Sequence, residues 1–155
     1  MPSRPASADL LPLRAELFGS VFVLTQYLAR RADAVLEPLG ITTKQWLLLA
    51  VLTRRFPGES PTLSEAALWH GSSRQNVKQI AQQLQDRGFL RITPDPADRR
   101  ALRLHLTDRV GALDSPAERA RQAAFFDEAF AALGPAETGQ LLRLVQRWLA
   151  SVTPR

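Results

Sequence analysis

The chain has 155 residues, of which 45% are hydrophobic and 23% are charged, and its formal net charge is +5. This length suits one folded domain with a hydrophobic core and appended helices. No apolar run approaches the roughly 18 residues of a membrane span, and residues 1–14 lack the apolar segment of a secretory signal. The absence of cysteine excludes disulfides, thiolate zinc sites and thiol redox sensing. We therefore expect a cytoplasmic protein with no membrane partner.

The positive charge is concentrated in one part of the chain. Residues 73–109 contain eight basic and four acidic side chains, which accounts for nearly all of the excess. Such a concentration predicts a local footprint for a polyanion.

The N-terminal third predicts two helices. Residues 1–8 are rich in Pro, Ser and Ala and predict a flexible tail. From residue 9 to about 36, apolar residues recur at helical spacing until a Pro-Leu-Gly sequence at 38–40 interrupts the pattern. A second helix begins at Thr42 or Thr43 and is so apolar that we expect it at the centre of the core.

Two shorter helical segments follow, with a glycine between them. The first begins at Thr62 or Ser64, and Gly71 can adopt the positive φ that ends it. The second is capped by Ser72 or Ser73 and carries apolar residues at helical spacing. Two helices joined by so tight a turn are typical of a helix-turn-helix.

After Gly88 the hydrophobic period changes from that of a helix to that of a strand. Residues 89–93 and 101–106 alternate apolar and polar side chains, which predicts two strands with one buried side. The residues between them, PDPADRR at 94–100, predict a hairpin loop. The predicted fold is therefore mainly α with a small β-hairpin wing, a winged helix-turn-helix.

The C-terminal part is again helical. Pro116 stands at the start of one helix, a Gly-Pro pair at 134–135 ends it, and one more amphipathic helix follows. A monomer would leave apolar parts of the terminal helices exposed, which usually indicates an interface. We therefore divide the chain into dimerisation helices at 9–40 and 112–153 and a winged helix-turn-helix lobe at 41–111.

The helix that begins near Ser73 has a polar face without acidic residues. Relative to an apolar stripe centred on Val77, Gln75 and Gln79 point away from the core and Lys78 lies on the flank. Amides and cations can bond base edges in the major groove, while serine hydroxyls and helix N-terminal N–H groups suit phosphates. A solvated glutamine-rich face is the alternative. The adjacent basic hairpin favours the interpretation as a DNA-reading face.

Arg99 and Arg100 lie where the hairpin loop meets the second strand. An extended arm at this place could reach the minor groove, where a guanidinium meets negative potential. Asp98 cannot favour phosphate, and we expect it to orient an arginine through a bidentate pair. The alternative is an exposed ion pair with no function.

The segments ITTKQWLLLAVL and TLSEAALWHGSSRQNVKQIAQQLQDRGFLRITPDPADRRALRLHLT resemble the core of the MarR family of winged-helix transcription regulators. The shared pattern includes a Ser-Arg helix start, a Gly-Phe-Leu strand start and a D-R-R wing followed by Leu-Thr. The resemblance covers about residues 10–110. It implies a homodimer joined through its terminal helices, bound to a pseudopalindromic operator in double-stranded DNA. It also implies repression that a small, often aromatic, ligand relieves.

By position, the resemblance assigns DNA contacts to the start of the second motif helix and to the wing, where Asp98 supports Arg100. The candidate DNA-binding residues are Ser73, Arg74, Gln75, Lys78, Gln79, Asp98, Arg99 and Arg100. Three positions depart from the family pattern: Trp69 replaces a common polar residue, His70 a core leucine, and Val110 a glycine.

An aromatic effector would lie between the dimerisation helices and the winged helix. We expect Phe18, Phe22, Tyr27 and Trp46 to line such a site. The alternative is that these aromatic side chains belong to the core.

Catalysis, a metal and a cofactor are not predicted. His70 and His105 stand far apart in the chain without metal-ligand spacing, and no catalytic motif is present. A second functional class stays open, in which the winged helix binds an acidic protein partner without specific DNA readout.

Overall fold

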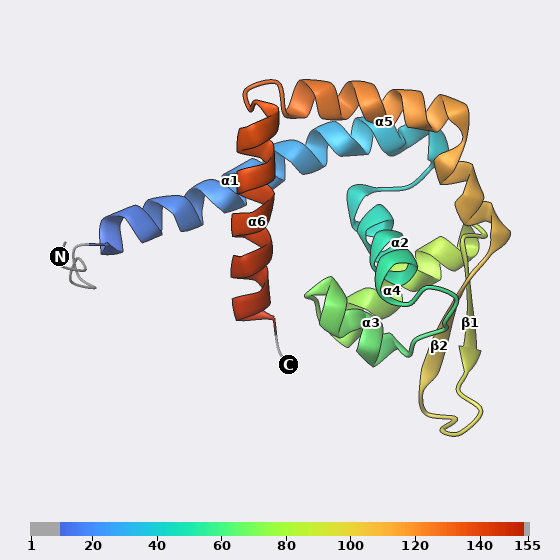
Figure 1. The fold of residues 1–155 in the computed structure, drawn as a ribbon. Helices are drawn as coiled ribbons and strands as arrows, with labels where there is room; N and C mark the ends of the chain where they lie inside the picture. Colours follow the sequence, from blue (N-terminus) through green and yellow to red (C-terminus); the bar gives the residue numbers. More distant parts are fainter. Residues whose placement is uncertain (1–9, 154–155) are drawn as a thin grey trace.

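The computed structural model describes residues 10–153, so the tail predicted at residues 1–8 lies outside the described residues. The fold is mainly α with a two-stranded hairpin, as the sequence predicts (Figure 1). In chain order the elements are α1 (Leu11–Leu36), the 3-10 helix η1 (Glu37–Leu39), α2 (Thr43–Arg55), α3 (Leu63–His70), α4 (Arg74–Asp86), β1 (Leu90–Pro94), β2 (Leu102–Leu106), the 3-10 helix η2 (Asp108–Asp114), α5 (Pro116–Ala129) and α6 (Pro135–Val152).

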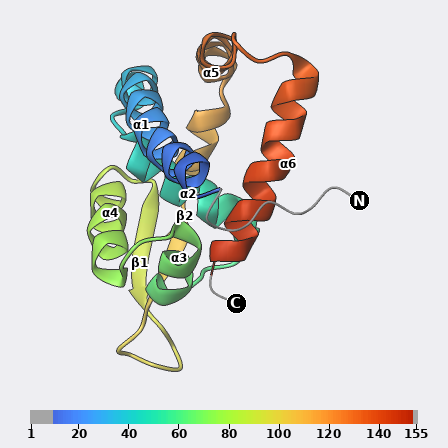
Figure 2. The same cartoon turned by 90° about the vertical axis from the view of Figure 1, so that its left-hand side faces the viewer.

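Helices α2, α3 and α4 pack with the hairpin into one lobe (Figure 2). Thr42 and Thr62 are the N-caps of α2 and α3. Each hydroxyl accepts from the main-chain N–H of the residue three positions later, Gln45 or Glu65, whose side chain in turn accepts from the threonine N–H. Gly71 follows α3 with φ 69°, a left-handed conformation that glycine adopts without strain and that turns the chain sharply into α4. The predicted helix-turn-helix is confirmed.

Every element of this lobe contributes to its core. The fully buried side chains include Leu48, Leu49 and Leu52 of α2, Leu63 of α3, Val77 and Leu84 of α4, Phe89, and Leu104 of β2. Burial of one such side chain stabilises the fold by about 1.5–3 kcal/mol. As its composition predicts, α2 lies at the centre.

The hairpin has the predicted antiparallel register, with Leu90 opposite Leu106 and Ile92 opposite Leu104. The sequence places Pro94 in the loop, but it is the last residue of β1, a strand-end position that proline tolerates. The hairpin is also tied to the chain before α3, because the Leu104 N–H donates to the main-chain oxygen of Pro61 at 2.9 Å.

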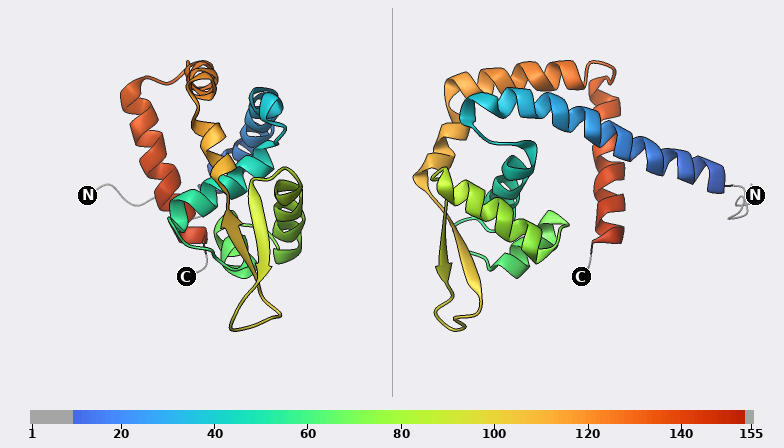
Figure 3. Two further views of the ribbon diagram at one scale, coloured as in Figure 1. Left: turned by 90° about the vertical axis from the view of Figure 1, so that its right-hand side faces the viewer. Right: turned by 180° about the vertical axis from the view of Figure 1, so that it is seen from behind.

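Helices α1 and α5 lie side by side above the lobe, and α6 descends from the end of α5 at the side of the lobe (Figures 1 and 3). Ser115 caps α5 by accepting from the Glu118 N–H, and Pro116 occupies its first turn as predicted. An ion pair between Arg31 and Glu128 joins α1 to α5. Between the hairpin and α5, Val110 packs against the lobe from η2.

Large apolar side chains remain exposed on α1 and α6. In α1 only Leu36 is buried, and no residue of α6 is buried. No single helix in residues 10–153 is long and apolar enough to cross a membrane. The segments Leu11–Leu39 and Thr43–Arg55 reach the required length and apolar content only when they are taken together. The chain bends by 80° at the break between them.

Candidate nucleic-acid interface

The start of α4 is organised by two serines and an asparagine. Ser73 is the N-cap and accepts from the Asn76 N–H at 3.1 Å. The Asn76 side chain in turn donates to the Ser72 hydroxyl at 2.6 Å. Both serines therefore take part in the turn, and the exposed Asn76 has its side-chain amide bonded to this turn.

The outer face of α4 is polar and cationic at its first turns. Gln75 and Gln79 are exposed and Lys78 is half-buried, while Val77 and Ile80 are buried against the lobe. No acidic residue lies in the first turn of α4. The amides therefore face solvent at a helix N-terminus, where the helix dipole and free N–H groups attract anions.

Arg74 brings this helix start and the wing together. Its guanidinium Nη2 donates to the main-chain oxygen of Arg100 over 3.3 Å, across 26 residues of sequence. Arg99 and Arg100 are both exposed in the loop between β1 and β2. The candidate residues of the helix and those of the wing thus form one surface.

Asp98 has a different contact from the one that the sequence predicts. Its carboxylate accepts from the main-chain N–H of Arg100 at 3.0 Å, and no ion pair in residues 10–153 includes it. The expected bidentate pair between Asp98 and an arginine side chain is wrong. A short acidic side chain followed two residues later by an N–H donor forms a tight local turn, which competes with side-chain pairing. Asp98 shapes the backbone that carries Arg100.

The acid that holds an arginine is Asp95, which sequence reasoning missed. Its buried carboxylate accepts from the N–H groups of Ala97 at 2.7 Å and Asp98 at 3.0 Å, and it forms an ion pair with Arg103. Arg103 also donates to the main-chain oxygen of Ser60 at 2.7 Å. These interactions, chiefly the two N–H groups and then the guanidinium, hold the pKa of Asp95 below its ordinary value. The Asp-Pro start of the loop is the signal for such a turn.

The two histidines have separate surroundings. His105 of β2 lies between the hydroxyls of Ser60, 2.7 Å from Nδ1, and Thr93, 2.8 Å from Nε2. Burial, followed by the charges of Arg91 and Arg103, lowers its pKa. No group of three or more His, Asp or Glu side chains within the described chain is placed to hold a metal ion.

His70, at the end of α3, has both ring nitrogens buried without a hydrogen-bond partner in the described residues. Burial lowers the pKa of His70, and the neighbouring main chain of Lys44, which is outside hydrogen-bond geometry, offsets only part of this effect. Sequence reasoning noted that a core leucine is common at this position, and the His70 side chain is half-buried.

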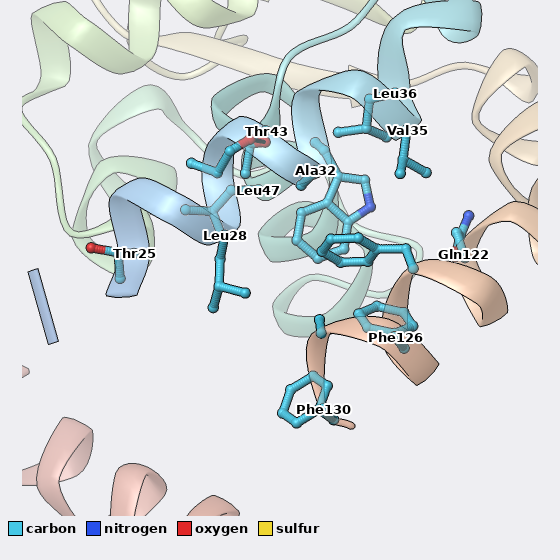
Figure 4. A pocket seen from close by; sticks show the side chains of 14 residues that line it. Thr25, Leu28, Ala32, Val35, Leu36, Thr43, Leu47, Gln122, Phe126 and Phe130 are labelled. Atoms are coloured by element: carbon cyan, nitrogen blue, oxygen red, sulfur yellow. Dashed lines mark hydrogen bonds between the residues drawn. The ribbon is translucent and has the colours of Figure 1, made fainter. Parts of the chain in front are cut away.

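A cavity of about 390 Å³ lies between α1, α2 and α5 (Figure 4). Of the four predicted effector residues, only Trp46 lines it. Phe18, Phe22 and Tyr27 are exposed on α1 and outside its wall. The other aromatic lining residues are Phe125 and Phe126 of α5 and Phe130, which directly follows that helix. They were missed because their approach to α2 depends on how α5 folds back over α1.

The cavity wall contains no charged side chain. Its polar lining residues are Thr25, Thr43 and Gln122. The Thr43 hydroxyl already contacts the main-chain oxygen of Ala29 at 3.1 Å and the Asp33 carboxylate at 2.7 Å. The cavity therefore suits a small neutral molecule with an aromatic or apolar body.

Residues 39–101, which run from η1 to the wing, match the MarR family model. The winged-helix lobe is therefore similar to the MarR family over this segment. The matched segment contains all eight candidate DNA-binding positions, whereas α1, α5 and α6 lie outside it.

Three known proteins resemble the chain. The transcriptional activatory protein BadR of Rhodopseudomonas palustris is 26% identical over 97 residues, which cover 63% of this chain and 55% of BadR. The match thus spans about half the length of that relative. BpsR of Bordetella bronchiseptica, whose DNA binding is regulated by 6-hydroxynicotinic acid, has a TM-score of 0.71 and 21% identity, over 86% of this chain and 98% of BpsR.

The third is the MarR family regulator Sco3205 of Streptomyces coelicolor in complex with DNA. It has a TM-score of 0.73 and 20% identity, over 90% of this chain and 91% of that one. Both structural likenesses extend well beyond the matched MarR segment. They therefore show that the terminal helices are arranged around the lobe much as they are in these two structures.

Proposed function

We propose that the protein is a transcription regulator that binds a pseudopalindromic site in double-stranded DNA as a homodimer. In this proposal it represses the genes beside that site, and a small aromatic compound in the cavity between α1, α2 and α5 releases it.

The observation that carries the proposal is the contact of Arg74 with the wing. It joins the exposed amides of Gln75 and Gln79 to the exposed Arg99 and Arg100 in one surface. Amides and cations on a helix can read base edges in the major groove, while the wing arginines can enter the adjacent minor groove. The MarR match over this surface and the DNA complex of Sco3205 support the same assignment.

The exposed apolar side chains of α1 and α6 support a homodimer. Phe22 and Tyr27 of α1 and Leu142, Leu149 and Val152 of α6 are each more than half exposed. Such a surface is unfavourable in water and suits an obligate interface. Two-fold symmetry would then place the two recognition helices on half-sites about 34 to 36 Å apart.

The uncharged cavity supports the effector part of the proposal. Its wall joins α2 of the lobe to α1 and α5, so an occupant would contact both parts of the molecule. A ligand changes the relative position of the lobe and the terminal helices only if it binds one arrangement of them more tightly than another. We expect a neutral aromatic compound, and Phe126→Ala is expected to weaken its binding.

Selection of bound fragments from random DNA tests the function. We expect a dyad consensus with half-sites one helical turn apart, and preference over random DNA of about 10³ or more. Light scattering at micromolar concentration should give the mass of two chains. If selected fragments are bound no tighter than random DNA, the regulator proposal fails. The basic wing then serves another partner, such as an acidic protein.

A further inference from the structure

Gln45, in the first turn of α2, is buried, and its side chain makes two hydrogen bonds. Its Oε1 accepts from the Thr42 N–H at 3.0 Å, and its Nε2 donates to the Oε1 of Gln83 at 2.8 Å. The first bond fixes the orientation of the amide, because only its oxygen can accept from a main-chain N–H. The amide nitrogen is thereby directed at Gln83, in the last turn of α4.

Within the described residues, this is the one side-chain hydrogen bond between α2 and α4. Beside it, Leu48 and Leu49 of α2 share an apolar cluster with Val77 of α4. Apolar contacts are not directional, so they leave small rotations of one helix against the other open. A buried hydrogen bond is lost on such a rotation, and a polar pair of this kind can therefore specify a single register.

A rotation of α4 would redirect the residues that face DNA in the proposed function. Gln79 lies about one turn before Gln83, and Gln75 lies about one turn before Gln79. Residues four apart on a helix differ by only roughly 40° in direction. The three amides therefore follow one stripe of α4, and the bond at Gln83 restrains the direction of the other two.

The first turn of α2 is bound in turn to α1. The Thr43 N–H donates to the Asp33 carboxylate at 2.6 Å, and the Thr43 hydroxyl contacts the same carboxylate at 2.7 Å. A path of hydrogen bonds thus leads from Asp33 of α1, through the start of α2 and Gln45, to α4. In the proposed function, α1 also carries part of the homodimer interface.

We propose that Gln45 is a positioning residue that sets which spacing of DNA half-sites the homodimer accepts. This inference rests on the proposed function, because it requires two α4 helices on one dyad. Each α4 is held through Gln83 and Gln45 to the helix that meets the partner, so the two recognition helices keep a fixed separation. Without the bond, each α4 turns against its own α2, and the dimer tolerates half-sites at other separations.

The test compares binding to the selected dyad with binding to a derivative that has one base pair inserted at its centre. The insertion moves the half-sites apart by about 3.4 Å and turns them relative to each other by about 35°. We expect the native chain to prefer the selected spacing. In Gln83→Met this preference should fall roughly three- to tenfold, the effect of one hydrogen bond. Competition titrations at fixed salt measure it.

Further variants assign the effect to the bond between the two glutamines. Gln45→Met should reduce the preference as Gln83→Met does, and the double variant should be no worse than either, because all three lack the same bond. Gln83→Glu retains an acceptor for Gln45 and should keep the preference. Gln82→Met changes the exposed neighbour and should also keep it. Thermal unfolding shows whether each variant is folded, and Gln83→Met decides the test if Gln45→Met is not.

An unchanged spacing preference in Gln83→Met would overturn the inference. An equal loss of affinity for both spacings would also overturn it, because that is the result expected of a direct base contact. So would additive losses in the double variant. If the native chain itself binds both spacings equally, the homodimer on a dyad fails together with this inference, so the native chain distinguishes the two failures.

Discussion

The guanidinium of Arg74, the first residue of α4, donates a hydrogen bond to the main-chain oxygen of Arg100 in the wing loop, over 3.3 Å. The loop is thereby held against the start of the recognition helix. Asp98 completes the arrangement, because its carboxylate accepts from the N–H of the same Arg100. One residue of the wing thus has both its N–H and its carbonyl engaged, while its side chain stays exposed.

We predict that Arg74→Gln loosens the wing. Amide hydrogen exchange in residues 97–101 should become faster, and affinity for the selected DNA site should fall roughly tenfold, about the effect of one hydrogen bond to a charged group. Arg91→Gln, which removes an exposed positive charge from β1, is the matched control. Equal exchange rates in the two variants would show that Arg74 does not hold the loop.

Gln75→Ala is expected to reduce sequence discrimination. Loss of a bidentate amide contact should weaken the binding free energy by about 1–3 kcal/mol on the selected site and by much less on random DNA. Gln82→Ala, on the same exposed face two turns further from the helix start, should leave the discrimination unchanged. Binding is measured by competition titrations at fixed salt. An equal loss on selected and random DNA would remove Gln75 from the reading residues.

Arg100→Gln should change the salt dependence of DNA binding. A side chain that neutralises one phosphate contributes about 1 to the slope of log affinity against log salt. We expect the slope to fall by about that amount, as measured from 50 to 200 mM salt. Arg103→Gln is the contrast, because Arg103 is occupied by Asp95 and Ser60 and its loss should leave the slope near that of the native protein. An unchanged slope in Arg100→Gln would contradict the wing assignment.

Asp95 should give the fold a dependence on acid pH. Its pKa is lowered in the folded protein by the N–H groups of Asp98 and Ala97 and by Arg103. Its contribution is therefore fully present above the ordinary aspartate pKa of about 3.9, and it is lost as the pH falls through the lowered folded pKa. Asp95→Asn should be less stable than the native protein at pH 7, and this difference should shrink at about pH 3. Urea unfolding at both pH values measures it. A constant difference would contradict this role.

His70→Leu is expected to stabilise the protein. Both ring nitrogens are buried without a partner in the described residues, so an apolar side chain of similar size removes a desolvation cost of about 1 kcal/mol. Burial lowers the pKa of His70, so the unfolded chain takes up a proton first as the pH falls below about 6.5. The advantage of leucine should therefore grow from pH 7 to pH 5. His105 is present in both proteins and cancels. A variant less stable than the native protein at both pH values would contradict the interpretation.

Elements with a local signal were predictable from the sequence. Alternate capping residues were open at each helix start, and the structure chooses Thr42, Thr62 and Ser73. The hairpin register follows from alternation, since Leu90 and Ile92 must share the buried face with Leu104 and Leu106. Gly71 is the one residue type that makes the turn into α4 without strain.

Contacts between distant segments were not predictable. Arg103 pairs with Asp95, and Asp98 pairs with no arginine side chain, because the loop buries the carboxylate of Asp95. The positions of the two aspartates in the sequence do not show which carboxylate will be buried. The aromatic lining of the cavity between α1, α2 and α5 likewise depends on α5 lying along α1, which brings Phe126 to the wall and leaves Phe22 outside.

Trp46 belongs to α2 of the lobe and packs against its core, yet its side chain also lines the cavity that α1 and α5 enclose. In the proposed function, one indole ring therefore contacts both the effector and the lobe that binds DNA. Thermodynamic reciprocity then requires bound DNA to change the affinity for the effector by the same factor by which the effector changes the affinity for DNA.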